Sequence, residues 1–543
     1  MSPPPAHPHP RPAPDGPHRF ARSRTLGAIA TAVAVAFALA GAVLPGTAAA
    51  QPPLTQVSLT FDDANANQMT AATTLTSNGL RGTFYVPSGL VGAPDYMTVA
   101  NLNTLAAGGH EIGGHTVTHP DLTTLPADEA ARQVCNDRVN LTDWGFQVTS
   151  FAYPFAASTA ATEQIVADCG YNSARGLGDI ESRFGCAGCG FSEQTPPANP
   201  YYTRALDMVD STWTLQDLQD AVTNAENNGG GWVQFTFHHV CDGCDPLSVS
   251  PALFDQFTTW LAAREATNNT VVRTVHEVIG GTVAPATPGP VVEPPAPGEN
   301  AVKNPSLETP GSTSLPQCWF AGGYGVNTPT FTTTTTAAEA RTGTKAEVVD
   351  VTGYVSGDAK LLPTFDLGGC SPTVVPGHTY SLRAWYKSTA VTQFVVYYRT
   401  GIGTWAYWTS SPWFAAATDW TQATWTTPPI PDGATGLSFG LSMFNNGTVT
   451  TDDYEMYDAA GAPEATASSA QTARIEPVPP AARAPRVTVQ SPVYAQPRIT
   501  ELVGPVSHRA RPDRHGPPPQ EIHFVPGPGL VEPGTPFAVV GTP

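Results

Sequence analysis

The chain has 543 residues, which is enough for two or more domains. Its 26 basic and 45 acidic side chains give a formal net charge of −19. This charge argues against a nucleic acid or an anionic lipid surface as partner, because both need a basic protein face.

The first 50 residues have the pattern of an export signal. Three arginines precede an uncharged segment from about Leu26 to Leu44, and Ala48-Ala49-Ala50 then forms a small-x-small cleavage site before Gln51. We expect residues 1–50 to be removed as a signal peptide. The mature protein is then secreted, with attachment to the cell wall as an option. An uncleaved membrane anchor is the alternative, because the apolar segment is longer than a typical signal core.

Residues 51–284 alternate between strand-like and helix-like runs. The strand-like runs are 57–61, 82–86, 149–153 and 232–237, and the helix-like runs are 97–107, 127–143, 162–169 and 215–227. This alternation predicts an α/β barrel or an open parallel sheet. Active sites on such folds lie at the carboxyl ends of strands, and Asp62 and Asp63 directly follow the first run.

The rest of the chain has a different composition and residue pattern. Residues 285–299 are rich in proline and predict a semi-rigid linker. Residues 300–460 contain short Thr-, Tyr- and Trp-rich runs, such as 379–386 and 437–444, which predict an antiparallel β-sandwich. Residues 461–543 are dominated by Pro, Ala and Arg without periodicity, and we expect a disordered tail.

All the cysteines follow the leader, at positions 135, 169, 186, 189, 241, 244, 318 and 370. An even number in an exported chain favours disulfides. The pairs C186-A-G-C189 and C241-D-G-C244 also have the thiolate spacing of a structural zinc site, which is the alternative. We expect loop disulfides at these two pairs and a disulfide between Cys318 and Cys370.

Two stretches carry the chemistry. Asp62 and Asp63 stand side by side after an apolar run, where two like charges need a neutralising partner. His115 and His119 are four residues apart, so on a helical turn their rings would share one face and could bind one metal ion. One carboxylate and two histidines leave coordination positions open for water, which is the composition of a catalytic metal site.

Four motifs occur in the order T60-F-D-D63, H115-T-V-T-H119, F151-A-Y-P-F155 and F237-H-H-V240. This order resembles the polysaccharide deacetylase family, also called carbohydrate esterase family 4 or the NodB-homology family, over about residues 54–280. The resemblance implies a distorted (β/α) barrel that removes N-acetyl or O-acetyl groups from polysaccharides with the help of a divalent metal, most commonly Zn²⁺. It implies an acetylated polysaccharide as the partner, with the oligomeric state left open and no membrane contact after signal cleavage.

The resemblance also implies roles for residues of the first two motifs. Asp62 is the general base that takes a proton from the attacking water, while Asp63, His115 and His119 bind the metal. The residue after the doublet is usually glycine in this family and is Ala64 here.

In the last two motifs the resemblance assigns an oxyanion contact and a general acid. A backbone N–H of Tyr153 or Phe155 faces the developing oxyanion. His238 protonates the leaving amine or alcohol, and His239 is its competitor, because neighbouring residues on a strand point to opposite faces.

The chain departs from the family pattern at two further places. The arginine that usually orients the base is replaced by Ala152, and Arg175 or Arg204 could supply the charge from another loop. The aspartate that usually tunes the catalytic histidine has only D210-S-T-W213 as a weak counterpart. These departures motivate the hypothesis of a catalytically degenerate, carbohydrate-binding barrel.

The C-terminal region resembles jelly-roll carbohydrate-binding modules in two short phrases, N304-P-S-L-E308 and V375-P-G-H-T-Y-S-L-R-A-W385. Exposed aromatic rings can stack on sugar rings. Our candidates for this role are Trp405, Tyr407, Trp408 and Trp413, and we expect Trp385, Trp420 and Trp425 to lie in the core.

Together these patterns predict a secreted, metal-dependent deacetylase followed by a carbohydrate-binding sandwich. The expected substrate is an N-acetylated amino-sugar polymer such as chitin, peptidoglycan or an exopolysaccharide. Acetylated xylan, which needs ester hydrolysis, is the alternative substrate.

Overall fold

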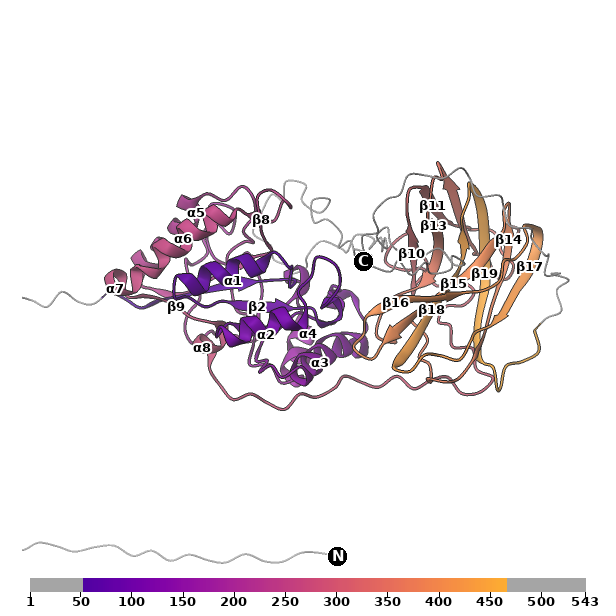
Figure 1. Ribbon diagram of the computed structural model, residues 1–543, viewed down its shortest axis with the longest axis horizontal. Helices are drawn as coiled ribbons and strands as arrows, with labels where there is room; N and C mark the ends of the chain where they lie inside the picture. Colours follow the sequence, from indigo (N-terminus) through magenta and orange to yellow (C-terminus); the bar gives the residue numbers. More distant parts are fainter. Residues whose placement is uncertain (1–51, 466–543) are drawn as a thin grey trace, which may run out of the picture. The chain divides into compact units, whose positions relative to one another are not determined.

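The computed structural model describes residues 52–465, so the expected signal peptide and nearly all of the expected tail lie outside the described residues. Within this range the chain forms a region of parallel strands and helices, followed by a region built from strands alone (Figure 1). A search of the described helices for one that is long and apolar enough to cross a membrane finds none.

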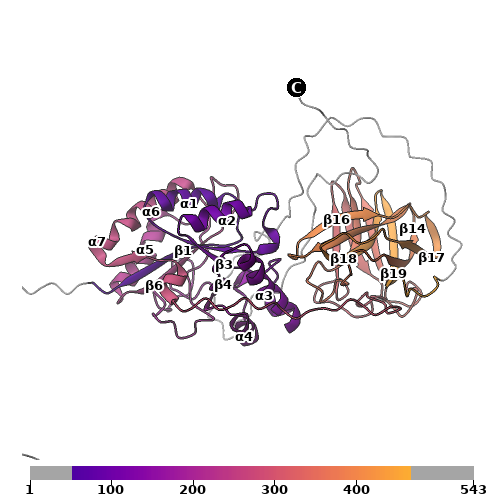
Figure 2. The same cartoon turned by 60° about the horizontal axis from the view of Figure 1, so that its bottom comes forward.

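The first region contains a seven-stranded parallel sheet surrounded by helices (Figures 1 and 2). Its strands are β1 (Thr55–Phe61), β2 (Thr83–Val86), β3 (Glu111–Gly114), β4 (Ser150–Ala152), β5 (Ser173–Arg175), β6 (Gly231–Phe237) and β9 (Thr270–Val272). Its helices are α1 (Gln68–Ser77), α2 (Val99–Ala107), α3 (Ala127–Asp143), α4 (Ala160–Asp168), α5 (Leu215–Asn227), α6 (Pro251–Ala262), α7 (Arg264–Asn268) and α8 (Val275–Ile279). The predicted helices at 127–143 and 215–227 have the predicted bounds, and those at 97–107 and 162–169 are correct to within two residues.

The sheet is an irregular barrel. Its strand order is β5-β4-β3-β2-β1-β6, with β9 also paired to β1. Between β5 and β6 runs a segment without regular strand structure, at residues 203–209. Thr203 N–H donates to Ala174 O at 2.8 Å, and Leu206 N–H donates to Gln234 O at 3.2 Å. This segment takes the place of a regular strand, and the predicted distorted (β/α) barrel is confirmed.

The first strand shows why the sheet forms at the centre of this region. Every residue of β1 is buried, as expected for a parallel strand that is covered on both faces. Phe61, its last residue, pairs in register with Phe84 of β2 and Phe237 of β6. Its ring stacks on both of these rings, with centroids 4.5 and 5.4 Å away. β1 and β6 therefore end at the same level, with β2 two residues longer, and the residues that follow these strands meet at one edge of the sheet.

The second region is the predicted antiparallel β-sandwich. Its strands are β10 (Trp319–Tyr324), β11 (Thr328–Thr333), β12 (Glu347–Thr352), β13 (Asp358–Pro363), β14 (Tyr380–Ser388), β15 (Thr392–Thr400), β16 (Trp405–Ser410), β17 (Ala417–Thr426), β18 (Ala434–Met443) and β19 (Gly447–Asp458). They form two five-stranded sheets, in the orders β10-β13-β18-β15-β16 and β11-β12-β19-β14-β17. Residues alternate between the two faces of each strand, so Leu382 and Ala384 of β14 enter the core between the sheets.

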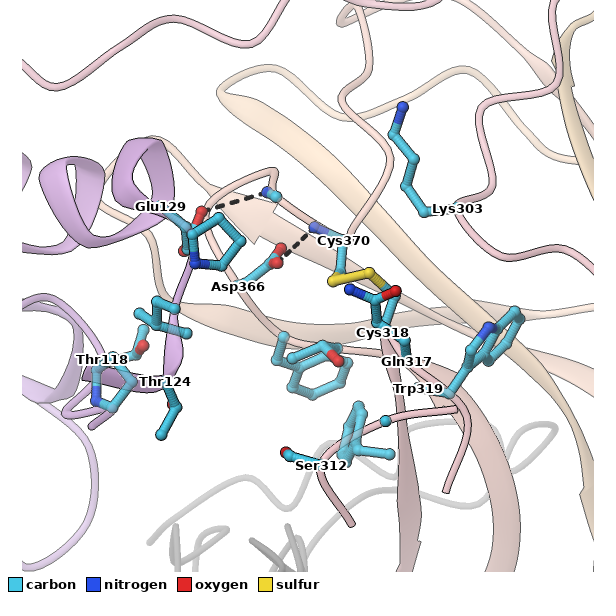
Figure 3. Close-up of a pocket in the computed structure, with 18 of the residues that line it drawn as sticks. Thr118, Thr124, Glu129, Lys303, Ser312, Gln317, Cys318, Trp319, Asp366 and Cys370 are labelled. Atoms are coloured by element: carbon cyan, nitrogen blue, oxygen red, sulfur yellow. Dashed lines mark hydrogen bonds between the residues drawn. A yellow bond between two sulfur atoms is a disulfide. The ribbon is translucent and has the colours of Figure 1, made fainter. Parts of the chain in front are cut away.

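All eight cysteines form disulfides, in the pairs Cys135–Cys169, Cys186–Cys189, Cys241–Cys244 and Cys318–Cys370. The predicted loop disulfides and the predicted Cys318–Cys370 pair are confirmed. Figure 3 shows this last disulfide beside Asp366, whose carboxylate accepts a hydrogen bond from Cys370 N–H at 2.5 Å.

The predicted sugar-stacking residues of the sandwich are mostly not exposed. Trp405 is only 4% exposed, because it lies in a small cluster with Tyr397 and stacks on Phe365 with centroids 4.7 Å apart. Tyr407 packs partly buried against the same cluster, and Trp408 packs partly buried against the main sandwich core. The prediction is therefore wrong for Trp405, and these contacts also cover part of Tyr407 and Trp408.

The remaining tryptophans divide differently from the prediction. Trp413 is 40% exposed, as expected for a stacking residue. Trp425 packs against the core, but Trp385 and Trp420 belong to neither core cluster and lie on the outer side of their sheet. There the guanidinium of Arg341 lies 3.8 Å from the Trp385 ring centroid, and the ammonium of Lys387 lies 4.6 Å from that of Trp420. The core prediction is wrong for these two residues, because strand alternation points them away from the other sheet.

Candidate active site

The predicted site residues lie at the carboxyl ends of neighbouring strands. Asp62 and Asp63 follow β1, His115 follows β3, Arg175 ends β5 and His238 follows β6. Because these strands are parallel and adjacent or nearly so in the sheet, their ends converge at one edge. The structure thus brings together side chains that are up to 176 residues apart in the sequence.

Three of these residues form a compact cluster of potential metal ligands. Asp63, His115 and His119 each offer a ligand atom, and the three atoms lie within 4.8 Å of one another. Oδ1 of Asp63 lies 3.4 Å from Nε2 of His115 and 3.2 Å from Nε2 of His119, and the two Nε2 atoms are 3.2 Å apart. Both His115 and Asp63 are buried.

The two histidines do not share a helical turn, contrary to the prediction. Residues 115–119 form a loop after β3 in which Thr116 and His119 have positive φ angles of 68° and 62°. The Thr116 hydroxyl accepts a hydrogen bond from His119 N–H at 2.9 Å. A tight turn therefore brings His119 back toward His115. The prediction named the two histidines that lie together, but it attributed their proximity to a helical turn, whereas a loop brings them together.

The donor set fits a tetrahedral metal ion. His115 Nδ1 donates to Ala152 O at 2.7 Å, which leaves the lone pair of Nε2 facing the cluster. Ligand bonds of 2.0–2.1 Å at tetrahedral angles place neighbouring ligand atoms about 3.3–3.4 Å apart, close to the observed separations. Oδ1 of Asp63 is buried without a hydrogen-bond donor among the described residues. A divalent cation would satisfy this oxygen and both imidazole lone pairs.

The charges of the cluster depend on one another. Burial by itself raises the pKa of Asp63. At the acidic pH where this carboxylate titrates, the charge of protonated His119, a hydrogen bond from His115 and the charges of His238 and His115 outweigh burial and hold the pKa well below its usual value. Burial lowers the pKa of His119 to about 4, with a further contribution from the charge of His115. His119 is therefore neutral near pH 7, which is the form that binds a metal.

Arg175 supplies the positive charge beside Asp62. The related family usually takes this charge from an arginine at the position of Ala152. Its Nη2 atom lies 2.5 Å from Oδ2 of Asp62, and Nη1 donates to the Thr236 hydroxyl at 2.7 Å. Ala152 of β4 and Arg175 of β5 are register partners, so the guanidinium comes from the adjacent strand at the level of the missing arginine. Arg204, the other candidate, pairs with Glu193 instead. Oδ1 of Asp62 is buried and has no hydrogen-bond partner among the described residues, so this oxygen is available to a water molecule.

The backbone after β4 distinguishes the two predicted oxyanion contacts. Tyr153 N–H donates to Arg175 O at 3.3 Å and is therefore engaged. Phe155, two residues further on, has a positive φ of 58°. Its ring is 36% exposed and meets the His119 ring edge-on, with centroids 4.9 Å apart. Phe155 is therefore the better candidate of the two for the oxyanion contact.

The two histidines after β6 are in different surroundings. His239 is held by Asn67, whose Nδ2 lies 3.0 Å from the ring Nδ1. His238 is buried, and it lies close enough to Asp63 and His119 to influence the pKa of each. Its Nδ1 has no hydrogen-bond partner among the described residues. His238 is thus the histidine that is free to exchange a proton at the cluster.

The weak fourth motif does not reach this histidine through any hydrogen bond or ion pair found among the described residues. Asp210 accepts hydrogen bonds from the backbone and hydroxyl of Thr212, and so closes its own turn. Trp213 is buried in the core and stacks on Phe184. The sequence analysis also missed Thr236, whose hydroxyl accepts a hydrogen bond from Arg175. Its one indication in the sequence is that a polar residue interrupts the apolar run of β6.

Backbone strain is concentrated at the site. Asp63 and Ala64 have φ angles of 75° and 55°, in the left-handed region that glycine adopts most easily. Ala64 stands where the related family has glycine, so the turn keeps its shape without that residue. Such conformations cost on the order of 1–3 kcal/mol each and tend to occur at functional sites.

Comparison with known proteins finds one matching family model and one similar curated protein. Residues 50–174 match the family model described as polysaccharide deacetylase. A gellan lyase from Bacillus sp. is 35% identical over 122 residues, which are 22% of this chain. The chain spans only 5% of the length of that curated relative.

Several solved structures are also similar. The family 4 carbohydrate esterase from Streptomyces lividans is 17% identical, with a TM-score of 0.28 over 40% of this chain and 92% of that chain. The deacetylase PplD from Streptococcus pyogenes is 19% identical, with a TM-score of 0.27 over 30% of this chain and 69% of that one. The peptidoglycan deacetylase PdaC from Bacillus subtilis is 18% identical, with a TM-score of 0.26 over 42% and 90% of the two chains.

The matched residues 50–174 include β1 with the aspartate doublet, the loop with both histidines, and β4 with the residues that follow it. Three of the four motifs therefore fall within the match. The chain thus contains a polysaccharide deacetylase domain, which the family model matches over residues 50–174.

Proposed function

We propose that this protein is a secreted, metal-dependent polysaccharide deacetylase that hydrolyses the N-acetyl groups of an amino-sugar polymer. In this proposal a signal peptide at 1–50 is removed. The barrel of residues 51–284 carries the catalysis, and a linker at 285–299 tethers it to a carbohydrate-binding sandwich at 300–460. Tethering raises the local concentration of the enzyme at an insoluble polymer.

The observation that carries the proposal is the pairing of two different carboxylates at one strand end. Asp63 lies with two imidazoles in a metal-ligand arrangement, while Asp62 lies against Arg175 with one oxygen free. A divalent ion at Asp63, His115 and His119, most commonly Zn²⁺, would supply Lewis acidity toward the acetyl carbonyl and the attacking water.

The chain's own residues divide the remaining work. Asp62 accepts the proton of the attacking water at Oδ1, while Arg175 holds Oδ2 and fixes the direction of the carboxylate. Phe155 N–H faces the oxygen on which negative charge develops. His238 gives a proton to the leaving amine, so that the amide bond can break.

The arginine contact also bears on the rival hypothesis of a degenerate barrel. That hypothesis rested on Ala152 and on the weak fourth motif. Arg175 provides a guanidinium at the base, which supports a functional site.

The test is the release of acetate from two substrates measured side by side, acetylated chito-oligomers and acetylated xylan. The proposal expects release from the chito-oligomers, and loss of that release in Asp62→Asn. Release from xylan alone would replace it with an esterase function. No release from either, with sugar binding retained, would establish a binding protein.

A second measurement addresses the metal. An anomalous-scattering map of crystals grown with Zn²⁺ is expected to place the ion among Asp63, His115 and His119. The mechanism fails if the ion lies elsewhere or if these three residues remain free of metal.

A further inference from the structure

The β1 and β6 strands separate at the edge of the sheet that bears the proposed base and acid. The last ladder contact between them is the hydrogen bond from Asp62 N–H to Phe237 O, at 2.9 Å. Beyond this point the carbonyl groups of Asp62 and His238 need donors from elsewhere, because a buried carbonyl without a partner is costly.

One side chain serves both carbonyls. Nε2 of Gln68 lies 2.5 Å from Asp62 O and 2.7 Å from His238 O. An amide NH₂ group has two hydrogens, which matches the two acceptors. Gln68 is fully buried, and as the first residue of α1 it is fixed by its own N–H, which donates to Asn65 O at 3.0 Å.

A second amide holds the same histidine. Nδ2 of Asn65 donates to His238 O at 3.0 Å, so this carbonyl accepts two side-chain N–H groups, one from the loop that follows the aspartate doublet and one from the start of α1. The imidazole of His238 has no partner at Nδ1 among the described residues. The hydrogen bonds from Gln68 and Asn65 therefore hold His238 through its main chain.

We infer that Gln68 is a positioning residue that fixes the spacing between the proposed base Asp62 and the proposed acid His238. Asn65 supports this role through its own hydrogen bond to His238 O. The carboxylate and the imidazole must act on opposite sides of one reacting carbon, so an error in their separation weakens both proton transfers. A displacement of about 1 Å can reduce the rate about 100-fold. This inference rests on the proposed function for the roles of Asp62 and His238.

The test compares Gln68→Met with Gln234→Met. Gln234 is a matched control, because it is also fully buried, lies on β6 and donates from Nε2 to two oxygens, Thr203 Oγ1 at 3.0 Å and Arg204 O at 2.9 Å. Neither acceptor belongs to Asp62 or His238. The two variants should therefore lose similar stability but differ in catalysis.

For Gln68→Met we expect kcat on the chito-oligomer to fall by about 10- to 100-fold with KM within about two-fold of the wild type. For Gln234→Met we expect kcat within about three-fold of the wild type. Equal kcat values in the two variants would overturn the inference while leaving the deacetylase function intact.

A milder variant and a spectroscopic measurement complete the test. Asn65→Ala removes one of the two donors to His238 O and should lower kcat by about 3- to 10-fold, which gives a result even if Gln68→Met does not fold. In protein labelled with ¹³C-histidine, the His238 ring signal should move in Gln68→Met or Asn65→Ala and stay in place in Gln234→Met. This readout needs no substrate. An unmoved signal therefore refutes the positioning role, and absent acetate release in the wild type refutes only the proposed function.

Discussion

Replacement of Arg175 by methionine should destabilise the barrel severely, because it leaves a buried carboxylate without its counter-charge. The side chains of Arg175 and Asp62 are 1% and 4% exposed, and their nearest atoms are 2.5 Å apart. Two unit charges about 4 Å apart interact by about 4 kcal/mol at an effective dielectric constant of 20. Removing one partner of such a buried pair typically costs about 3–5 kcal/mol.

The matched control is Arg183→Met, which also breaks an Arg–Asp pair. The Arg183 side chain is 57% exposed, and its contact to Asp217 is 2.7 Å long. Solvent screens such a pair, so we expect a loss below about 1 kcal/mol. Urea unfolding followed by circular dichroism at 222 nm reports on the barrel, because the helices lie there and the sandwich is built from strands.

A double variant tests the reason for the effect. In Asp62→Asn with Arg175→Met no charge is left buried, so the double variant should be more stable than the sum of the two single changes predicts. The reasoning is refuted if Arg175→Met and Arg183→Met lose the same free energy of unfolding, or if the two changes at the site are additive.

Four further outcomes are expected. Dialysis against a chelator should abolish acetate release and lower the melting temperature, and added Zn²⁺ should restore both; unchanged activity in the metal-free protein would contradict the metal site. Burial raises the pKa of Glu347 from 4.5 to about 7, so the folded protein holds this proton while the unfolded chain has released it. The free energy of unfolding should therefore fall by about 3 kcal/mol as pH rises between these values, and urea titrations should show this loss absent in Glu347→Gln. Replacing Cys318 and Cys370 by serine opens a loop with a sequence separation of 52 and should cost about 4 kcal/mol in thermal or urea unfolding, and a loss below about 1 kcal/mol would contradict the predicted constraint. In polysaccharide pull-downs Trp413→Ala should weaken binding without loss of stability, whereas Trp405→Ala should cost about 3–5 kcal/mol of stability because its ring is buried; the reverse pattern would restore Trp405 as a sugar contact.

The helices and central strands could be predicted because their signals are local. Helix α3 occupies the predicted residues 127–143, and β1 was predicted from an apolar run that ends at the aspartate doublet. The potential metal ligands Asp63, His115 and His119 could also be predicted, because two short motifs contain the residue types and the spacing that a metal site needs. The geometry of the histidine pair could not be predicted. It depends on the positive φ of Thr116, and a positive φ is readily expected only at glycine.

The sequence by itself determined the class of fold, the disulfide between Cys318 and Cys370, and the residue types that can bind a metal and move a proton. Only the tertiary structure decided between Arg175 and Arg204 at Asp62, and which tryptophans of the sandwich face solvent. The physical reason is the same in both cases: hydrophobic pattern and chemical type are properties of a segment, whereas a charge partner or an exposed face depends on which strand lies beside it. Arg175 reaches Asp62 because β5 lies next to β4, and that neighbourhood exists only in the folded sheet.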